Sequence, residues 1–320
     1  MPLLLGSVVF GWLVTAGIAA DAGELHRAAA AGDVVEVERL IAAGADFDAV
    51  DRAGAPLHHA TTRGHAEAVA VLLARGADPN VLSRDGATAL HRAAYRGDAE
   101  IAGLLLSANA DPTIENFTDG TPLHSAAAAG HVEIVTLLLG HGADIDARPD
   151  NNRAATPLQE AASEGQLAVV GRLIDAGACL DCPDISGRTP LYRAAGFGHV
   201  AVVERLIDAG ACLDCPTSRG FTPLVNAVFE GRAPVVAVLL SAGAEFDHRT
   251  HDGITALHYA VAGAEFDIAR MLLEGGADVS VRSLHRSLGA ISLEGTPLDV
   301  ARRVGDAEIE ALLTRFGATE

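Results

Sequence analysis

The stretch Thr121-Pro122-Leu123-His124 decides the fold, because related stretches recur along the chain at a nearly constant spacing. A leucine equivalent to the third residue of this stretch marks each copy. These leucines are Leu25, Leu57, Leu90, Leu123, Leu158, Leu191, Leu224, Leu257 and Leu298. Neighbouring markers are 32 to 35 residues apart, and the last interval is 41 residues. A repeat of this period predicts a stacked array of nine small units.

Each unit carries the start and stop signals of two helices. Thr121 is a good N-cap, because its hydroxyl can accept a hydrogen bond from an orphan N–H of the first turn, and the proline after it fits the first helical position. The first helix is expected to end near Gly130, and the apolar run 132–139 predicts a second helix that ends at Gly142. Glycine just past a helix end adopts the left-handed conformation without a Cβ penalty. In the third unit Asn109, the other residue type that tolerates this conformation, replaces the glycine.

The units are expected to stack, because each has apolar residues on both sides and cannot fold alone. The array is predicted to span residues 21–320, with the first unit (about 21–50) and the last unit (about 283–320) acting as caps. The first unit lacks both the Thr and the Pro of the repeated stretch. The last unit has Asp299 at the His position and several charged residues on its helices.

A two-helix unit of 33 residues with the signature Thr-Pro-Leu-His-x-Ala, complete at 121–126, resembles the ankyrin repeat. The resemblance covers about residues 21–320. It implies an all-α ankyrin-repeat solenoid of about nine helix-turn-helix repeats with β-hairpin finger loops. It also implies a non-catalytic scaffold that binds a partner protein through the concave face of fingers and first helices. A purely structural spacer is another possibility.

The family places its variable, exposed residues at the finger tips and at three sites on each first helix. These sites are the residue after the motif His and the two residues before the glycine. Carried over by resemblance, the expected partner-binding residues are Arg92, Tyr95, Arg96, Phe117, Arg193, Phe197, Phe221, Asn226, Phe229 and Tyr259. Aromatic and Arg side chains are the types enriched in interface hot spots. The alternative is that some of these rings pack against the neighbouring repeat.

Eight of the 13 histidines occupy positions that the repeat explains. Five stand at the motif position, and the resemblance implies that they hold neighbouring repeats in register: His26, His58, His91, His124 and His258. Three more, His65, His131 and His199, follow the glycine of the first helix. Units five, six, seven and nine have other residues at the motif position, which puts the local hydrogen-bond network in doubt there: Gln159, Tyr192, Val225 and Asp299.

Two Cys-x-x-Cys pairs lie in an identical stretch that occurs at 172–183 and again at 205–216. Four thiolates could bind zinc, and paired disulfides or a redox role are further possibilities. The identical flanks favour a duplicated repeat. Equivalent positions of stacked units should lie about 10 Å apart, too far for four sulfurs to share one ion at about 2.3 Å. We therefore expect no metal site, and a metal or redox protein using these pairs is the alternative function.

The acidic composition excludes some function classes. The chain has 23 Lys+Arg against 42 Asp+Glu, a net charge of −19, which disfavours nucleic-acid binding because phosphate contacts need a positive face. Several carboxylates follow the repeat and are expected to be turn residues: Asp46, Asp78, Asp111, Asp144 and Asp278. No nucleophile–base or phosphate-loop pattern stands out. We therefore expect no enzyme and no cofactor, but a monomer with a protein partner.

Residues 1–20 differ from the rest, because none of their side chains is charged. The segment fits a secretory signal or a single anchor helix. Against this, no Lys or Arg precedes the apolar run and three glycines interrupt it, and an apolar segment lying on the first repeat is the alternative. The expected location is cytoplasmic, or exported or membrane-anchored if the segment is a signal or an anchor.

Overall fold

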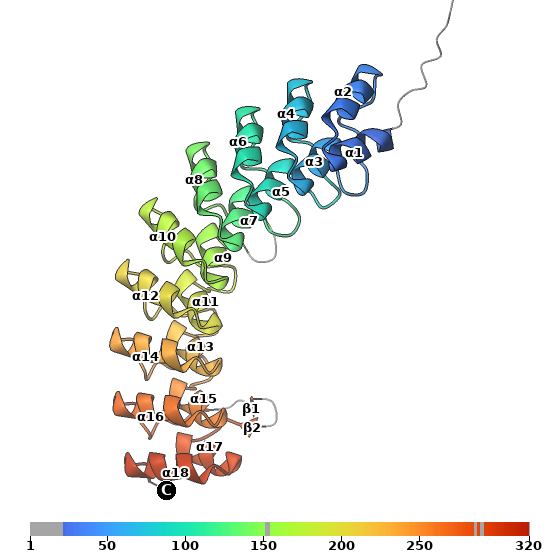
Figure 1. Cartoon of the computed structure of the whole chain (residues 1–320). Helices are drawn as coiled ribbons and strands as arrows, with labels where there is room; N and C mark the ends of the chain where they lie inside the picture. The colour runs from blue at the N-terminus through green and yellow to red at the C-terminus, as the bar shows by residue number, and fades with distance from the viewer. Residues whose placement is uncertain (1–21, 151–153, 285–286, 289–290, 320) are drawn as a thin grey trace, which may run out of the picture.

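The computed structural model describes residues 22–150, 154–284, 287–288 and 291–319. The apolar segment 1–20 lies outside these residues. The described chain forms nine helix pairs that stack in chain order into a curved array (Figure 1). Odd-numbered helices form the inner row next to the connecting loops, and even-numbered helices form the outer row. The predicted all-α ankyrin-type solenoid is confirmed.

The inner helices are α1 (Ala22–Ala31), α3 (Pro56–Arg63), α5 (Ala89–Arg96), α7 (Pro122–Ala129), α9 (Pro157–Ser163), α11 (Pro190–Phe197), α13 (Pro223–Phe229), α15 (Ala256–Ala262) and α17 (Pro297–Val304). The outer helices are α2 (Val34–Ala42), α4 (Ala66–Ala74), α6 (Ala99–Ser107), α8 (Val132–Gly140), α10 (Leu167–Asp175), α12 (Val200–Asp208), α14 (Ala233–Ser241), α16 (Phe266–Glu274) and α18 (Ala307–Arg315).

The inner helices begin as the sequence predicts. Thr156, for example, has extended backbone angles, and its hydroxyl accepts a hydrogen bond from the N–H of Gln159 at 3.3 Å. The side chain of Gln159 accepts one from the N–H of Thr156 at 2.8 Å, which completes a capping box. Pro157 occupies the first helical position, where a missing N–H leaves no partner unsatisfied.

Left-handed residues end the helices. Gly97 closes α5 at φ +83°, and a Cβ there would lie 2.5 Å from the His131 ring, so both backbone and space require glycine. Asn109 follows α6 at φ +64°, where the eight other units place glycine. The substitution works because Asn tolerates the left-handed region better than most residues.

The core consists of small aliphatic side chains. Each inner helix packs on the inner helices before and after it, and the outer helices do the same. The marker leucines, such as Leu90 and Leu123, are fully buried between repeats, with alanines filling the space around them. A repeat therefore has most of its apolar surface covered only when both neighbours are present.

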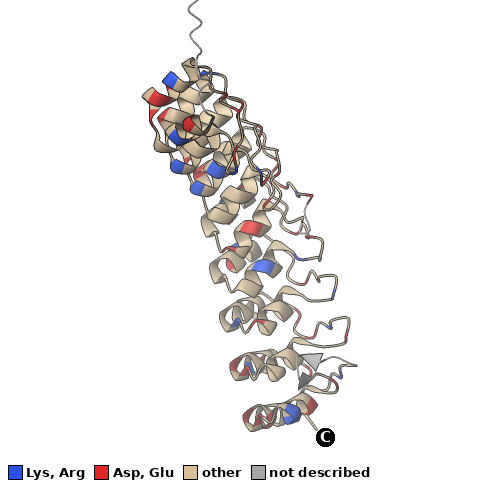
Figure 2. Ribbon diagram, turned by 90° about the vertical axis from the view of Figure 1, so that its right-hand side faces the viewer, with Lys and Arg blue, Asp and Glu red and all other residues tan. Residues whose placement is uncertain are grey.

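The fingers are the loops that connect each outer helix to the next inner helix, and they project along one side of the stack (Figure 2). Backbone hydrogen bonds close the tips, for example from the N–H of Thr217 to the oxygen of Phe221 at 2.9 Å and from the N–H of Gly220 to the oxygen of Thr217 at 2.8 Å. Within the described residues only the last finger has paired strands, β1 (Ser287–Leu288) and β2 (Ile291–Ser292). Among the helices of the described chain, none has both the length and the apolar character that crossing a bilayer requires.

Candidate functional site: the finger and inner-helix face

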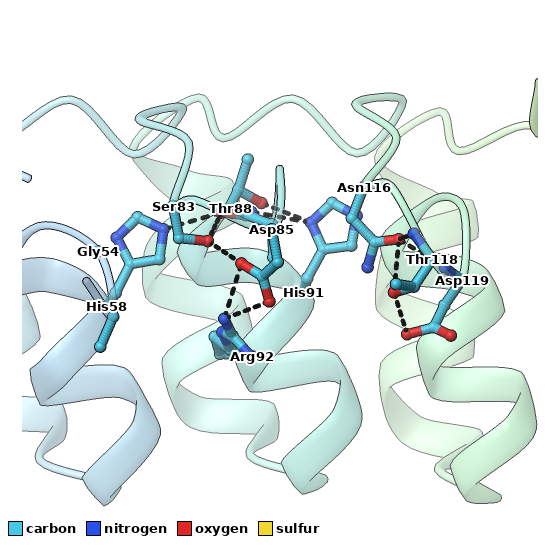
Figure 3. Close-up of polar contacts among 12 residues, drawn as sticks. Gly54, His58, Ser83, Asp85, Thr88, His91, Arg92, Asn116, Thr118 and Asp119 are labelled. Atoms are coloured by element: carbon cyan, nitrogen blue, oxygen red, sulfur yellow. Dashed lines mark hydrogen bonds and ion pairs between the residues drawn. The ribbon is translucent and has the colours of Figure 1, made fainter. Parts of the chain in front are cut away.

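The motif histidines link each inner helix to the next finger. The Nδ1 atom of His91 accepts a hydrogen bond from the N–H of Thr88 at 3.1 Å, and Nε2 donates to the oxygen of Gly120 in the following repeat at 2.9 Å (Figure 3). Equivalent links to the next repeat join His58 to Ala87, His124 to Ala155 and His258 to Gly295. The role that the resemblance implied for these histidines is present in the structure.

Burial keeps these imidazoles neutral. It lowers the pKa of His91 and of His258 to about 4, and it also lowers the pKa of His58 and His124. The hydrogen bond that each ring donates to a carbonyl opposes this shift but does not overcome it. The neutral ring is the form that the site needs, because one nitrogen accepts and the other donates.

The motif position differs in units five to seven. Gln159 keeps the link, since its amide nitrogen donates to the oxygens of Arg188 and Cys182 while its oxygen accepts from Thr156. The doubt that the sequence raised at Gln159 is therefore removed. The side chains of Tyr192 and Val225 make no hydrogen bond to the described part of the next repeat, so the link from the motif position is absent in units six and seven.

A second set of contacts runs backwards. The residue after the inner-helix glycine donates to a carbonyl oxygen of the previous inner helix. His65 reaches Ala30 at 3.1 Å and His199 reaches Ser163 at 2.8 Å. Other units make the same kind of contact through His131, Gln166 and Arg232. The ends of α1, α5, α7, α9 and α11 are thereby fastened to the next repeat by a side chain as well as by packing.

The residue after the motif position pairs with an acid on the finger of its own repeat. Arg92 contacts Asp85 at 2.7 Å, as Figure 3 shows. Partial burial opposes the ionisation of Asp85, but the hydroxyl of Ser83 and the charge of Arg92 lower its pKa. Arg193 contacts Asp184 at 2.9 Å, and both side chains are buried. Arg193 was expected to be exposed for a partner. Instead it anchors the finger.

Tyr259 is a second correction. Its side chain is buried, because its ring packs against Phe221 and Phe229 with ring centroids 5.5 Å away in each case. Phe221 is half-buried in the same cluster. Asn226 is also half-buried and donates to the oxygen of Tyr192 at 3.0 Å. These three residues therefore contribute to packing between repeats, as the alternative reading of the aromatic residues allowed.

Four predicted aromatic side chains are exposed on the inner helices and fingers. Phe117 is 74% exposed, Tyr95 71%, Phe197 58% and Phe229 43%. Arg96 is exposed beside Tyr95, although one of its nitrogens donates to the oxygen of Thr62 at 2.8 Å. Large apolar groups facing solvent on one face are unusual unless another molecule covers them.

A groove with two connected pockets crosses units six and seven. One pocket of about 460 Å³ lies between the fingers, and a second of about 280 Å³ continues along the inner helices. They share Arg188, Tyr192, Asn226 and Glu230. Arg219 and Phe229 line the first pocket only, and Phe197 and Arg232 the second only. We call this the Arg188/Arg219 groove.

Two smaller pockets surround Tyr95 in units three and four, with volumes of about 290 and 120 Å³. We call them the Tyr95 pockets. Their charged lining is mostly acidic: Asp85 and Asp119 line the larger pocket, and Asp119 and Glu160 the smaller. Arg92 is the cation of the larger pocket, and it is paired with Asp85.

The four cysteines form two disulfides, Cys179–Cys182 and Cys212–Cys215, each within one motif. Disulfide sulfurs offer no thiolate to a metal ion. The two bonds occupy the turns that precede fingers 184–188 and 217–221, which are the fingers of the Arg188/Arg219 groove.

The carboxylates that follow the repeat are turn residues, as predicted. Asp78, for example, accepts a hydrogen bond from the N–H of Asn80 at 2.9 Å, and four other units repeat this turn with Asp46, Asp111, Asp144 and Asp278. In units five and six a cysteine takes this place. Two residues later a side chain accepts from the next repeat: Asp181 from the N–H of Cys212 at 2.9 Å, and Asp214 from that of Glu245.

One cluster among the described residues could hold a metal ion. Ligand atoms of His26, Asp51 and His59 lie within 4.8 Å of one another. However, Nε2 of His26 faces two carbonyl oxygens, those of Ala49 at 2.9 Å and Gly54 at 3.2 Å, and must donate to them. The contact of His59 with Asp51 at 3.0 Å repeats the ion pair of Arg92 with Asp85. The contacts of His26 therefore form a link between repeats, and the contact of His59 with Asp51 anchors a finger.

Nine stacked helix pairs, with fingers on one side and exposed aromatic rings on the inner row, define a helical repeat protein of the solenoid class. The family model of ankyrin repeats (3 copies) matches residues 25–116, 115–184, 175–250 and 214–283, so the chain belongs to the ankyrin repeat family. Ankyrin repeats are generally protein–protein interaction modules, and the family is typically non-catalytic. A search of curated proteins gives no match.

Several features of the face were not predicted. Ile185 and Leu284, which are 63% and 82% exposed, are apolar finger residues that were not among the expected partner-binding residues. The side-chain contacts between inner helices and their own fingers could have been predicted from the sequence, because an acid stands seven to nine residues before Arg92, His59 and Arg193.

Proposed function

We propose that the chain is a non-catalytic recognition protein that binds a partner protein, as a single chain, through its finger and inner-helix face. The observation that carries the proposal is the Arg188/Arg219 groove, where the exposed rings of Phe197 and Phe229 stand at neighbouring pockets. Rings in such positions bury a large area at low entropic cost when a partner covers them. Tyr95 and Phe117 extend the exposed apolar surface toward the N-terminal repeats.

The test compares the full chain with a Tyr95→Ala/Phe197→Ala/Phe229→Ala variant in a pull-down from native cell lysate. The matched control is Phe316→Ala, because Phe316 is also an exposed ring but follows the outer helix α18. A protein that the wild type and the control retain and the triple variant loses supports the proposal. If the triple variant retains the same proteins, or if no protein is retained, the proposed face is wrong.

Thermal unfolding followed by circular dichroism accompanies the test. The triple variant should lose only about 1 kcal/mol, most of it from the contacts of Phe229 with Phe221 and Tyr259, because Tyr95 and Phe197 are largely exposed. A large loss of thermal stability would show that the rings belong to the core and would remove the basis of the proposal.

A further inference from the structure

The Arg188/Arg219 groove is positively charged although the chain as a whole carries −19. Its two pockets are lined by Arg188, Arg193, Arg219 and Arg232, and by one carboxylate, Glu230. Fixed charges of one sign in a recessed site focus the local potential, so the groove attracts anions even in an acidic protein.

The internal ion pairs leave part of this positive charge uncompensated. Asp184 is the carboxylate shared by two guanidinium groups, at 2.9 Å from Arg193 and 3.3 Å from Arg188. One carboxylate cannot neutralise both. Arg219 is exposed on the next finger, and no ion pair within the described residues joins it to a carboxylate. Arg188 and Arg219 can therefore each donate to an external anion.

The remaining lining fits a peptide better than a small ion. Phe197 and Phe229 offer apolar contact, and Asn226 and Tyr192 add polar groups between them. Burial raises the pKa of Tyr192, so its phenol stays neutral and can hydrogen-bond to a backbone. The hydroxyls of Ser186 and Ser218 line the same pocket. The two pockets share four lining residues, so one extended segment can lie along both.

We propose that the Arg188/Arg219 groove binds an extended acidic segment of the partner protein. Carboxylates of the segment pair with Arg188 and Arg219, and an apolar side chain between them packs on Phe197 or Phe229. The proposal rests on the proposed function, since it names the partner chemistry for the same face. The acidic Tyr95 pockets repel such a segment, which confines it to units six and seven.

The experiment selects binders for the immobilised full chain from a display library of random short peptides. The enriched peptides are synthesised with a fluorescent label, and their binding is measured by fluorescence anisotropy at two ionic strengths. The variants are Arg188→Ala/Arg219→Ala, the single Arg219→Ala, Phe197→Ala/Phe229→Ala, and the control Arg52→Ala/Arg84→Ala. Arg52 and Arg84 are exposed on fingers of the N-terminal repeats. The single variant protects against a folding defect, because Arg219 has no ion pair to lose within the described chain.

We expect Asp and Glu to be enriched together with apolar residues, and affinity to fall as ionic strength rises. The double Arg variant should bind roughly tenfold or more weakly and Arg219→Ala roughly threefold more weakly, while the control matches the wild type. Neutral or basic winners, no winners, or unchanged affinity in both Arg variants would overturn the acidic segment. If one of these outcomes occurs but the Phe197→Ala/Phe229→Ala variant still binds more weakly than the wild type, the proposed function stands. Binding that depends on neither pair refutes both proposals.

Discussion

Repeats two to four and repeats six and seven hold their fingers in different ways. In repeats two to four a buried histidine such as His91 ties each inner helix to the next finger. In repeats six and seven Tyr192 and Val225 stand at that position, and backbone hydrogen bonds between neighbouring fingers remain. The N–H of Ser218 donates to the oxygen of Ser186 at 2.9 Å, and that of His251 to the oxygen of Arg219 at 3.3 Å. Such bonds are not confined to this region, since the N–H of Phe117 also donates to the oxygen of Asp85 at 3.1 Å.

The difference shows that the array keeps its register in repeats six and seven without the side-chain link at the motif position. The histidine link occupies the space between helix and finger and satisfies a buried carbonyl. In repeat six Tyr192 takes the place of the histidine and lines the largest pocket described here, and two disulfides close the turns before the fingers of this pocket. The same position of the repeat thus carries a link between repeats in repeats two to four and lines the proposed binding groove in repeat six.

The largest expected effect is the pH dependence of the histidine-linked repeats. The folded pKa of about 4 for His91 and His258 lies below the unfolded value of 6.5, so the unfolded chain binds more protons between these values. Stability is therefore complete above about pH 6.5 and falls as pH drops toward 4, by roughly 3 kcal/mol for each histidine. Urea unfolding at a series of pH values measures this loss. The His91→Gln variant should lose the part of this pH dependence that His91 causes. If the free energy of unfolding of that variant depends on pH as in the wild type, the effect does not come from His91.

Replacement of His91 comes next. His91→Ala leaves the Gly120 oxygen and the Thr88 N–H without partners and opens a cavity, so we expect a loss of about 2 to 3 kcal/mol. His91→Gln should cost less than about 1 kcal/mol, because Gln159 makes both contacts in repeat five. Hydrogen exchange of finger 116–120 locates the loss. Equal losses in the two variants would show that packing volume, and not the link, holds the finger.

Reduction of the two disulfides should loosen the other region. Each bond closes a very short loop, for which chain entropy predicts a stabilisation of about 2 kcal/mol. After reduction, amide exchange should rise in fingers 184–188 and 217–221. It should stay unchanged in finger 83–87, which no disulfide precedes. A Cys179→Ser/Cys182→Ser variant should raise amide exchange in finger 184–188 more than in finger 217–221. If the exchange rates of these fingers are the same before and after reduction, the fingers do not depend on the disulfides.

The smallest effect separates rings that face solvent from a ring that also packs. Tyr95→Ala and Phe197→Ala should change the free energy of unfolding by less than about 0.5 kcal/mol. Phe229→Ala should cost about 1 kcal/mol, because its ring contacts Phe221 and Tyr259. Urea unfolding of the three single variants checks the order. A larger loss for Phe197→Ala than for Phe229→Ala would reverse it.

The fold could be predicted from the sequence because each signal is local and is repeated in most units. Thr156 and its equivalents start helices, left-handed residues such as Gly97 and Asn109 stop them, and the period sets the stacking. The exposed positions Tyr95, Phe117, Phe197 and Phe229 also followed from the register of the repeat. The capping roles of the two terminal units and the role of residues 1–20 stay predictions.

The burial of Arg193 and Tyr259 could not be read from the same register. A position fixes where a side chain starts, but its exposure depends on partners that differ between units. Arg193 is drawn inward by Asp184 on its own finger, and Tyr259 is covered by Phe221 and Phe229 of the repeat before it. The charge of the groove was also hidden, because the net charge of −19 averages over the whole surface.

The aspartates that accept a hydrogen bond from the next repeat bear on how such a chain can change its length during evolution. Asp181 accepts the N–H of Cys212 and Asp214 that of Glu245, so each bond crosses a single boundary between units. A gene segment that is copied as one whole unit brings an acceptor for the unit after it and a donor for the unit before it. The new junction is then complete from the first generation, and no compensating mutation is needed. Identical stretches such as 172–183 and 205–216 are what such a duplication would produce.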